Sequence, residues 1–239
     1  MEYDGTDFAG FQWQKDQRSV QGDLESALNK LTRQFVRVQG AGRTDAGVHA
    51  LGQVICFKAD TKIPMDRFST ALNSVLKKDV CIKAICETDS TFHARFSAKS
   101  RSYIYLILNR EQPSSLLRRY SLHYPSRLDI DAMNMGAKEL IGMHDFTSWS
   151  NSVKEARSTI RNIIHLRVRK VNSIVILQIE ANAFLHGMVR NITGTLLEVG
   201  MKKRQPEDIA KITERRDRQY AGPCAPAHGL CLVRVRYTA

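Results

Sequence analysis

The chain alternates between segments with helical periodicity and segments with strand periodicity. After Ser19, which can cap a helix, apolar residues at positions 20, 24, 27, 28 and 31 fall on one helical face. The same spacing predicts helices over residues 65–76, 130–141 and 184–199, and a short helix that Pro206 opens. Each of these helices therefore has one face available for a core.

Alternation over two residues predicts the strands. It is clearest from Arg101 to Leu108, where Tyr103, Tyr105 and Ile107 share one face and three aliphatic residues share the other. Because the aliphatic face is continuous, we expect the tyrosines to point to a groove or a second layer, either as core rings with bonded hydroxyls or as a stacking surface. Other strands are expected over residues 35–39, 53–57, 80–87, 163–171, 173–181 and 230–237.

The order of these elements predicts an α+β fold made of two halves. Residues 1–98 follow the order loop, helix, strand, long loop, strand, helix and strand, which is a split β-α-β arrangement. Residues 99–239 repeat this organisation in kind, with antiparallel strands and helices on one side. The polar and basic stretch between His93 and Arg101 is expected to connect the halves. A chain of 239 residues is long enough for two such domains.

The charge of the chain indicates a polyanionic partner. Lys and Arg number 36 against 24 Asp and Glu, which gives a formal net charge of +12. An excess of that size favours nucleic acid, although a basic surface also serves solubility alone. Arg95, Lys99 and Arg101 follow one another closely, and one face of the strand over residues 163–171 is basic. This clustering favours a binding role.

The composition does not support several other classes of chemistry. The five cysteines lack a C-x-x-C pair and are expected to be reduced core residues of a cytosolic protein. The seven histidines lack the spacing of metal ligands, and we find no glycine-rich phosphate-binding motif and no Ser-His-Asp grouping. The apolar runs are too short to cross a membrane. We therefore expect no metal, no nucleotide cofactor and no membrane partner.

A glycine-rich loop over residues 40–50 carries the candidate chemistry. It holds Arg43 and Asp45 between two predicted strands and is longer than a hairpin requires. Its glycines permit close approach of the backbone, and a carboxylate beside a guanidinium is held ionised and oriented. Asp-x-Gly is also common turn chemistry, in which the Asp side chain bonds its own backbone. The spacing alone leaves both interpretations open.

Further features of the second half bear on a site. Arg190 lies on the otherwise apolar helix predicted over residues 184–199, so it requires a partner, either in a structural ion pair or in a functional one. The run from Ser148 to Ser158 is too polar for a core and is expected to be a loop on the ligand side. His144 and Asp145 are neighbours in sequence, which rarely face each other, so a structural role is favoured over an acid–base pair.

A single outstanding carboxylate narrows the chemistry that is possible on a nucleic acid. A metal-dependent nuclease needs several converging carboxylates, and only Asp45 stands out in the sequence. A lone carboxylate can instead attack or deprotonate a sugar or a base. To reach a base, an enzyme must extract it from the stacked nucleic acid and hold it against an aromatic side chain. Tyr103 is a candidate for that side chain.

Several motifs follow one another along nearly the whole chain. The most specific are Arg43-Thr44-Asp45-Ala46-Gly47-Val48-His49 and, later, Met188-Val189-Arg190. Weaker ones are Tyr3-Asp4-Gly5-Thr6, Arg101-Ser102-Tyr103-Ile104-Tyr105, His144-Asp145-Phe146 and Ala225-Pro226-Ala227-His228-Gly229-Leu230. With these motifs in this order, the chain resembles the tRNA pseudouridine synthase A family.

The resemblance implies a cofactor-free isomerisation of uridine to pseudouridine in the anticodon stem-loop of tRNA. Asp45 matches the family's catalytic aspartate, which attacks the uracil ring or the sugar, or removes a sugar proton; the sequence leaves these routes open. The resemblance further implies that Tyr103 stacks on the target base, that Arg43 occupies the space of the flipped nucleotide and that Arg190 pairs with Asp45. The alternative is a catalytically idle RNA-binding or chaperone protein of the same fold.

The resemblance also implies a pseudouridine synthase fold, in which the sheets of the two halves join into one extended sheet with an active-site cleft between the halves. It implies a homodimer in which a tRNA touches both subunits. Candidate phosphate contacts are Arg95, Lys99, Arg101, Arg167 and Arg169. One departure is that the family has a complete strand ahead of the Tyr-Asp-Gly-Thr motif, whereas Met1 and Glu2 alone precede it here. We therefore expect that strand to be truncated or missing, because either the start site is annotated late or the first sheet has a bare edge.

Overall fold

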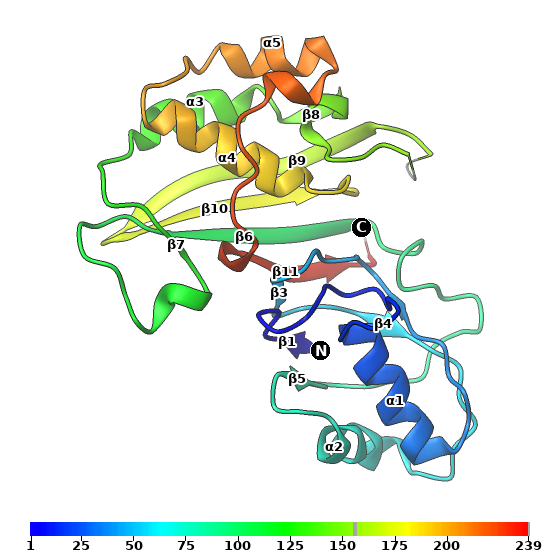
Figure 1. The fold of residues 1–239 in the computed structure, drawn as a ribbon. Helices are drawn as coiled ribbons and strands as arrows, with labels where there is room; N and C mark the ends of the chain where they lie inside the picture. The colour runs from blue at the N-terminus through cyan, green and yellow to red at the C-terminus, as the bar shows by residue number, and fades with distance from the viewer. Residues whose placement is uncertain (155–156, 239) are drawn as a thin grey trace. The chain divides into compact units, whose positions relative to one another are not determined.

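The computed structural model describes residues 1–154 and 157–238, and contacts divide the chain into two compact units (Figure 1). Unit 1 comprises Met1–Lys99 and the chain end from Leu232, and unit 2 comprises Ser100–Cys231. The division falls within the closing strand β11 (Leu230–Arg236). The chain end thus returns to unit 1, whereas the sequence-based expectation places everything after residue 98 in the second half. Both units combine helices with antiparallel strands, which confirms the α+β class.

Both predicted helices of unit 1 are confirmed. Helix α1 (Val20–Thr32) begins at the predicted cap, since the Ser19 side chain accepts a hydrogen bond from the backbone N–H of Gly22. It ends at Arg33, whose backbone is left-handed. Helix α2 (Met65–Val75) follows Pro64 and buries Phe68 and Leu72. The helices therefore contribute the apolar faces that their spacing predicts.

The strands of unit 1 are short and lie in two sheets. Strand β1 (Glu2–Tyr3) pairs antiparallel with both β3 (His49–Ala50) and β5 (Val80–Cys81), and β2 (Gln39–Gly40) pairs with β4 (Ile55–Cys56). Because β1 is paired on both sides, the expectation of a bare edge at the first strand is wrong.

Side chains of the helices explain why these strands are shorter than predicted. In the segment expected as a strand over residues 35–39, the backbone N–H of Val38 donates to Glu25 Oε1 of α1, at 3.0 Å. Beyond β5, the side-chain amide of Asn73 on α2 bonds both backbone groups of Ile82, at 2.8 and 2.9 Å. Backbone groups satisfied in this way are not available to a neighbouring strand.

Unit 2 is built on an antiparallel sheet of longer strands. Strands β6 (Ser100–Leu108), β10 (Ile174–Ala181), β9 (Ile160–Val171) and β8 (Gly142–Asp145) lie side by side in that order, and β7 (Leu122–His123) pairs with β6 in parallel. The predicted hairpin is confirmed as β9 and β10. Helices α3 (Ile130–Lys138), α4 (Met188–Gly200) and α5 (Asp208–Arg215) lie on one side of this sheet (Figure 1).

The tyrosine face of β6 belongs to the core of unit 2. Tyr105 pairs with Leu177 and Ile107 with Val175 across β6 and β10, and all four side chains are fully buried. On the opposite face of β6, Ile104 and Leu106 are half-buried, whereas Leu108 at the end of the strand is buried. The tyrosines therefore point to a second layer, in which Tyr105 packs against Gly229 and Tyr103 against Phe184.

Helix α4 begins later than its apolar pattern predicts. It starts at Met188 rather than Phe184, because Gly187 before it has a left-handed backbone with φ of 70°. A residue in that conformation cannot continue an α-helix. Phe184 packs instead edge-on against the ring of Tyr103, with ring centroids 5.1 Å apart.

The polar run from Ser148 to Ser158 is not wholly a loop outside the core. Ser148 and Trp149 are fully buried in a short 3-10 helix, η2 (Thr147–Trp149). The hydroxyl of Ser148 donates to Ile212 O, and Trp149 Nε1–H donates to Thr213 Oγ1. The expectation was wrong for these residues because α5 supplies partners for their polar atoms. Residues 155 and 156 of this run lie outside the described residues.

The C-terminal part of unit 2 runs close along α4. A Cβ atom on Gly194 would overlap the carbonyl oxygen of Pro223. Gly222 lies beside the same helix, and its backbone N–H donates to Thr195 Oγ1 at 2.9 Å. This close approach of backbone to helix depends on the absence of a side chain at position 194.

We predict that Gly194→Ala lowers the free energy of unfolding by roughly 1–3 kcal/mol, because the added methyl must displace backbone. Gly136→Ala in α3 is the matched control, since the atoms nearest its Cβ would be side-chain atoms of Ile209 and Leu196, at 3.0 and 3.4 Å, and a Pro206 backbone atom at 3.6 Å. Thermal and urea unfolding of both variants measure the difference. Equal losses for the two variants would contradict this packing.

Candidate active site

The loop that carries Asp45 is fixed in unit 1 through its neighbour Thr44. Thr44 is buried, and its Oγ1 lies 2.7 Å from the hydroxyl of Tyr3. Its carbonyl oxygen accepts a hydrogen bond from the backbone N–H of Phe11 at 3.0 Å. Both backbone and side chain of Thr44 are thus held by the N-terminal segment, which fixes the position of the adjacent Asp45.

Two glycines of the N-terminal segment let it approach this loop. Gly10 has φ of 113°, and a Cβ there would lie 2.9 Å from the carbonyl oxygen of Thr44. A Cβ on Gly5 would overlap the carbonyl oxygen of Val48. Both contacts are with backbone atoms, which cannot swing away as a side chain can. The N-terminal segment and the Asp45 loop therefore form one closely packed structure.

Gln53 holds the start of the loop from the other side. Its side chain is fully buried. Gln53 Nε2 donates to Gly42 O at 2.8 Å, and Gln53 Oε1 accepts from the backbone N–H of Gly42 at 3.3 Å. Neither this role of Gln53 nor the contact of Tyr3 with Thr44 is predicted from the sequence. In the sequence, Gln53 is distinguished only as an amide at the start of the strand predicted over residues 53–57.

Asp45 and Arg43 flank Thr44 and differ from it in exposure. Asp45 is half-buried and Arg43 is exposed. The carbonyl oxygen of Asp45 accepts a hydrogen bond from the backbone N–H of Val48 at 3.1 Å, so the residue also begins a turn. The turn uses the backbone of Asp45, so it is compatible with a catalytic role for the Asp45 side chain.

His49, which ends the most specific motif, is a packed residue of β3. It is buried, and its Nδ1 accepts from the backbone N–H of Gly5 at 3.0 Å. Asp4 Oδ1 lies 3.2 Å from the same nitrogen. These contacts join the motif that contains Asp45 and His49 to the N-terminal segment.

Tyr103 and Arg190 both belong to unit 2. Tyr103 is 7% exposed, and its ring meets Phe184 at an interplanar angle of 86°. Arg190 is half-buried in the first turn of α4. Its Nε–H donates to Ala225 O at 2.8 Å, while the backbone N–H of Ala225 donates to Arg190 O at 3.1 Å. This reciprocal pair orients the guanidinium on an apolar helix.

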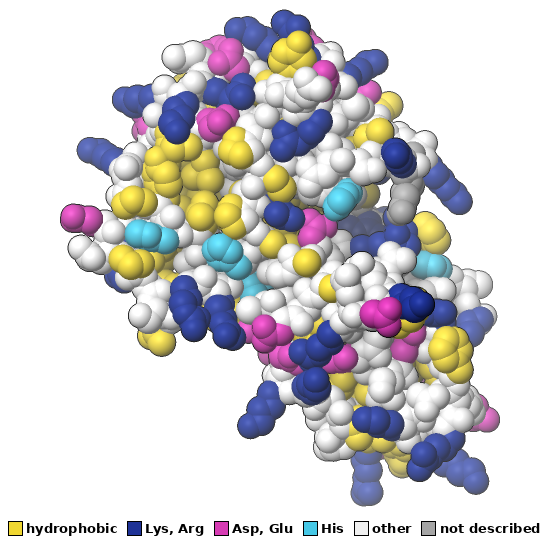
Figure 2. Space-filling view, viewed as in Figure 1, with side chains coloured by type: hydrophobic (Ala, Val, Ile, Leu, Met, Phe, Trp, Pro, Cys, Tyr) yellow, Lys and Arg dark blue, Asp and Glu magenta, His cyan; other side chains and the backbone are white. Residues whose placement is uncertain are grey.

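The candidate phosphate contacts differ in exposure. Arg95, Lys99, Arg167 and Arg169 are exposed. Arg101 is 7% exposed, and its Nη1 donates to Asn182 O at 2.8 Å. Lys and Arg side chains are scattered over the face in Figure 2, with acidic side chains among them. The side chains of His144 and Asp145 have separate partners, since His144 Nε2 bonds Ile141 O and Asp145 Oδ1 accepts from Thr147 Oγ1.

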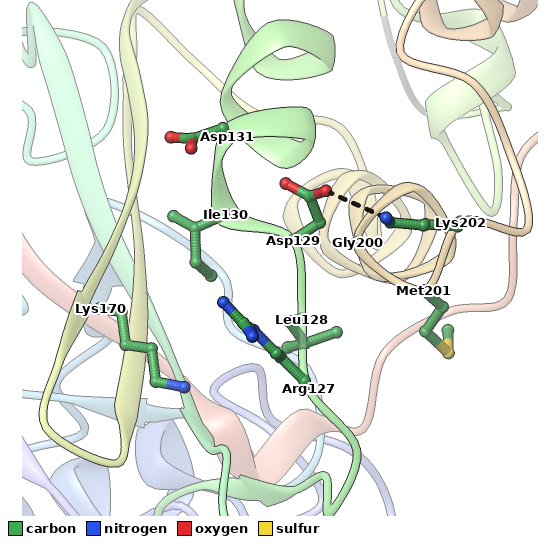
Figure 3. Close-up of a pocket in the computed structure, with 9 residues that line it drawn as sticks. All are labelled: Arg127, Leu128, Asp129, Ile130, Asp131, Lys170, Gly200, Met201 and Lys202. Atoms are coloured by element: carbon green, nitrogen blue, oxygen red, sulfur yellow. Dashed lines mark ion pairs between the residues drawn. The ribbon is translucent and has the colours of Figure 1, made fainter.

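A hollow of about 720 Å³ lies in unit 2, and none of the candidate residues described above lines it (Figure 3). It is lined by the start of α3, the end of α4 and Lys170 of β9. Its lining carries both signs of charge, and Lys202 Nζ lies 3.8 Å from Asp129 Oδ2. Asp129 is already engaged as the cap of α3. We therefore assign no chemistry to this hollow.

Within residues 1–154 and 157–238, no three His, Cys, Asp or Glu side chains are grouped so that they could hold a metal ion. In the same part of the chain, no helix has the length and apolar character needed to span a membrane.

Residues 1–97 and 137–238 match a protein family described as tRNA pseudouridine synthase. The chain is 45% identical to tRNA pseudouridine synthase A of Caldicellulosiruptor bescii over 237 residues, which is 99% of this chain and 97% of the relative. It is 45% identical to the protein of the same name from Acetivibrio thermocellus and 44% identical to that from Brevibacillus brevis, with the same coverage of 99% and 97%.

The bond between Tyr3 and Thr44 yields a stability prediction. We expect Thr44→Val to lower the free energy of unfolding by about 1–2 kcal/mol, because the buried Tyr3 hydroxyl loses its nearest partner. Tyr3→Phe removes the same hydrogen bond by deleting the tyrosine hydroxyl. The double variant should therefore lose about as much as either single variant in urea unfolding. Additive losses would show that the two hydroxyls do not act through one bond.

Proposed function

The chain belongs to the tRNA pseudouridine synthase family, and we propose that Asp45 is the catalytic group of its reaction in the anticodon stem-loop of tRNA. As a member of this family, the protein is an isomerase that converts uridine in tRNA to pseudouridine. The observation that supports the role of Asp45 is the fixed loop, in which the adjacent Thr44 bonds Tyr3 and Phe11. A reaction without a cofactor depends on such fixed placement of reacting groups.

The isomerisation exchanges one bond to the ribose for another. The bond from uracil N1 to ribose C1′ breaks, the base turns, and C5 bonds to C1′. C5 releases its proton and N1 gains one, so substrate and product contain the same atoms. Asp45 acts either as a nucleophile on the ring or the sugar, or as a base that removes a sugar proton. Either role uses a carboxylate whose position is fixed before the substrate arrives.

The remaining roles follow the same resemblance. Tyr103 stacks on the extruded base, Arg43 occupies the space that the flipped nucleotide leaves, and Arg190 pairs with Asp45. The exposure of Arg43 suits contact with a nucleic acid. The bond from Arg190 to Ala225 supports a fixed direction for its guanidinium. The cleft between the halves, in which these residues would meet, is part of this proposal.

We propose that exposed cations bind the tRNA backbone. Arg95 and Lys99 of unit 1, and Arg167 and Arg169 of β9, are exposed and so accessible to phosphates. Arg101 is largely buried, so we expect its contribution to be the smallest of the group. This group would position the tRNA without reading its sequence.

The proposal includes a homodimer in which a tRNA touches both subunits, and a cytoplasmic location without a metal or nucleotide cofactor. The dimer rests on the family resemblance. The cytoplasmic location rests on the cysteine pattern of the sequence. In the structure the five cysteines are half-buried or exposed thiols, so the expectation that they are core residues is wrong.

The catalytic role of Asp45 predicts a loss of tritium release from C5-labelled uridine in tRNA. Asp45→Asn should slow release by roughly a thousandfold or more, because the amide is neither a nucleophile nor a base. Asp60→Asn, at an exposed position of the same unit, is the matched control and should release tritium at the normal rate. Normal release by Asp45→Asn would contradict its role. No release by the unmodified protein would favour an idle RNA-binding or chaperone protein, which needs the basic surface but no oriented carboxylate.

The role of β9 predicts a salt-dependent loss of tRNA affinity. Replacing both Arg167 and Arg169 by Gln should weaken binding and reduce the slope of log affinity against log salt by about 1–2, with little change in kcat. The double replacement of Lys77 and Lys78, which are exposed in unit 1, removes the same charge and serves as the control. Equal changes in both double variants would indicate a general charge effect rather than contacts at β9.

A further inference from the structure

The segment from Gly222 to Gly229, here called the anchor loop, holds Arg190 of α4. Ala225 bonds Arg190 twice, through its carbonyl oxygen to Nε–H and through its N–H to the Arg190 carbonyl. The bond to Nε is the important one, because the planar guanidinium then has a fixed plane and a fixed direction. The direction of Arg190 therefore depends on the position of the Ala225 carbonyl.

The anchor loop is fixed to α4 at its start. The backbone N–H of Gly222 donates to Thr195 Oγ1, and the carbonyl of Pro223 occupies the space beside Gly194. These contacts hold the loop ahead of Ala225. Pro226 follows Ala225 and has no backbone N–H to donate. Its carbonyl oxygen is therefore the backbone group through which it can be bonded.

Tyr105 of β6 holds Pro226. Its hydroxyl donates to Pro226 O at 2.8 Å, one residue beyond the carbonyl that bonds Arg190. The ring is fully buried, and a Cβ on Gly229 would lie 2.6 Å from its Cζ atom. The tyrosine is therefore held by packing at its ring and bonds the loop with its hydroxyl.

The surroundings of Tyr105 keep its hydroxyl a donor. Burial raises the pKa of Tyr105, and the nearby positive charge of Arg190 only partly opposes this effect. The hydroxyl is therefore protonated at neutral pH and donates to Pro226 O throughout the range in which tRNA modification would be measured.

We propose that Tyr105 is a positioning residue for Arg190, acting through Pro226 and Ala225. This inference rests on the proposed function, since it assumes that Arg190 takes part in the reaction. Tyr105 does not touch the substrate in this proposal. Its hydroxyl sets the anchor loop, and the loop sets the guanidinium that is proposed to pair with Asp45. A ring that only filled the core would not need the hydroxyl.

Tyr105→Phe tests the proposal because it keeps the ring and removes the hydroxyl. Tritium release under single-turnover conditions should slow by about 10- to 100-fold, the range expected when a reacting group is slightly misplaced. The KM for tRNA should change less than about twofold, because no phosphate contact is removed. Tyr237→Phe is the matched control, since its hydroxyl also donates to a backbone carbonyl, that of Ala94 in unit 1, at 2.8 Å. This control should keep the normal rate.

A double-mutant cycle separates action through Arg190 from a general structural effect. Arg190→Lys keeps the charge but lacks the Nε–H that bonds Ala225, and it should itself slow tritium release. In the Arg190→Lys background, Tyr105→Phe should have little further effect. Hydrogen exchange measured by mass spectrometry should also be faster in the anchor loop of Tyr105→Phe and unchanged in α1.

The outcomes distinguish failure of this inference from failure of the proposed function. A normal rate for Arg190→Lys and Arg190→Ala would overturn the role of Arg190, and the positioning role with it. Slow Arg190 variants with a normal rate for Tyr105→Phe would overturn the positioning role alone. Equal slowing by Tyr105→Phe in both backgrounds, or unchanged hydrogen exchange in the anchor loop, would also overturn it. If Tyr105→Phe unfolds at the assay temperature, Gly194→Ala, which displaces the same loop, should give the same pattern in the cycle.

Discussion

The hydrogen bonds of Thr44 are the contacts on which the proposed site depends. Its hydroxyl lies against Tyr3 of β1 and its carbonyl accepts from Phe11, so one residue joins the Asp45 loop to the N-terminal segment. Gly10 permits this approach, because a side chain there would meet the Thr44 carbonyl. Asp45 is bonded covalently to this fixed residue. The position of the Asp45 carboxylate is therefore set by packing of the backbone. This packing restricts which residues can stand at Gly10 and at the other positions that contact the loop.

Unit 2 uses the same principle at Arg190. The guanidinium is directed by a backbone carbonyl of the anchor loop, and that loop lies against a glycine of α4 and a tyrosine of β6. In both units, a charged side chain with a proposed role is thus supported by main-chain contacts that small residues make possible. In an isomerisation without a cofactor, the protein contributes mainly the placement and the charge of such groups.

The sequence predicted those features that depend on local patterns. The cap at Ser19, the alternation along β6 and the hairpin of β9 and β10 all follow from neighbouring residues. The contacts of Tyr3 with Thr44 join residues 41 positions apart and have no local signal. For the same reason the burial of Trp149 was missed, since its partner on α5 is 64 positions away. The candidate residues themselves came from isolated charges and from family resemblance, and their supporting contacts became visible only in the fold.

The most direct test of the central claim is the crystal structure of the protein bound to its tRNA. We predict that one uridine of the anticodon stem-loop lies outside its stack on the ring of Tyr103, with the Asp45 carboxylate within contact distance of its ribose or ring and Arg190 beside that carboxylate. A bound tRNA whose anticodon stem-loop lies away from Asp45, or whose uridines all remain stacked, would contradict the account.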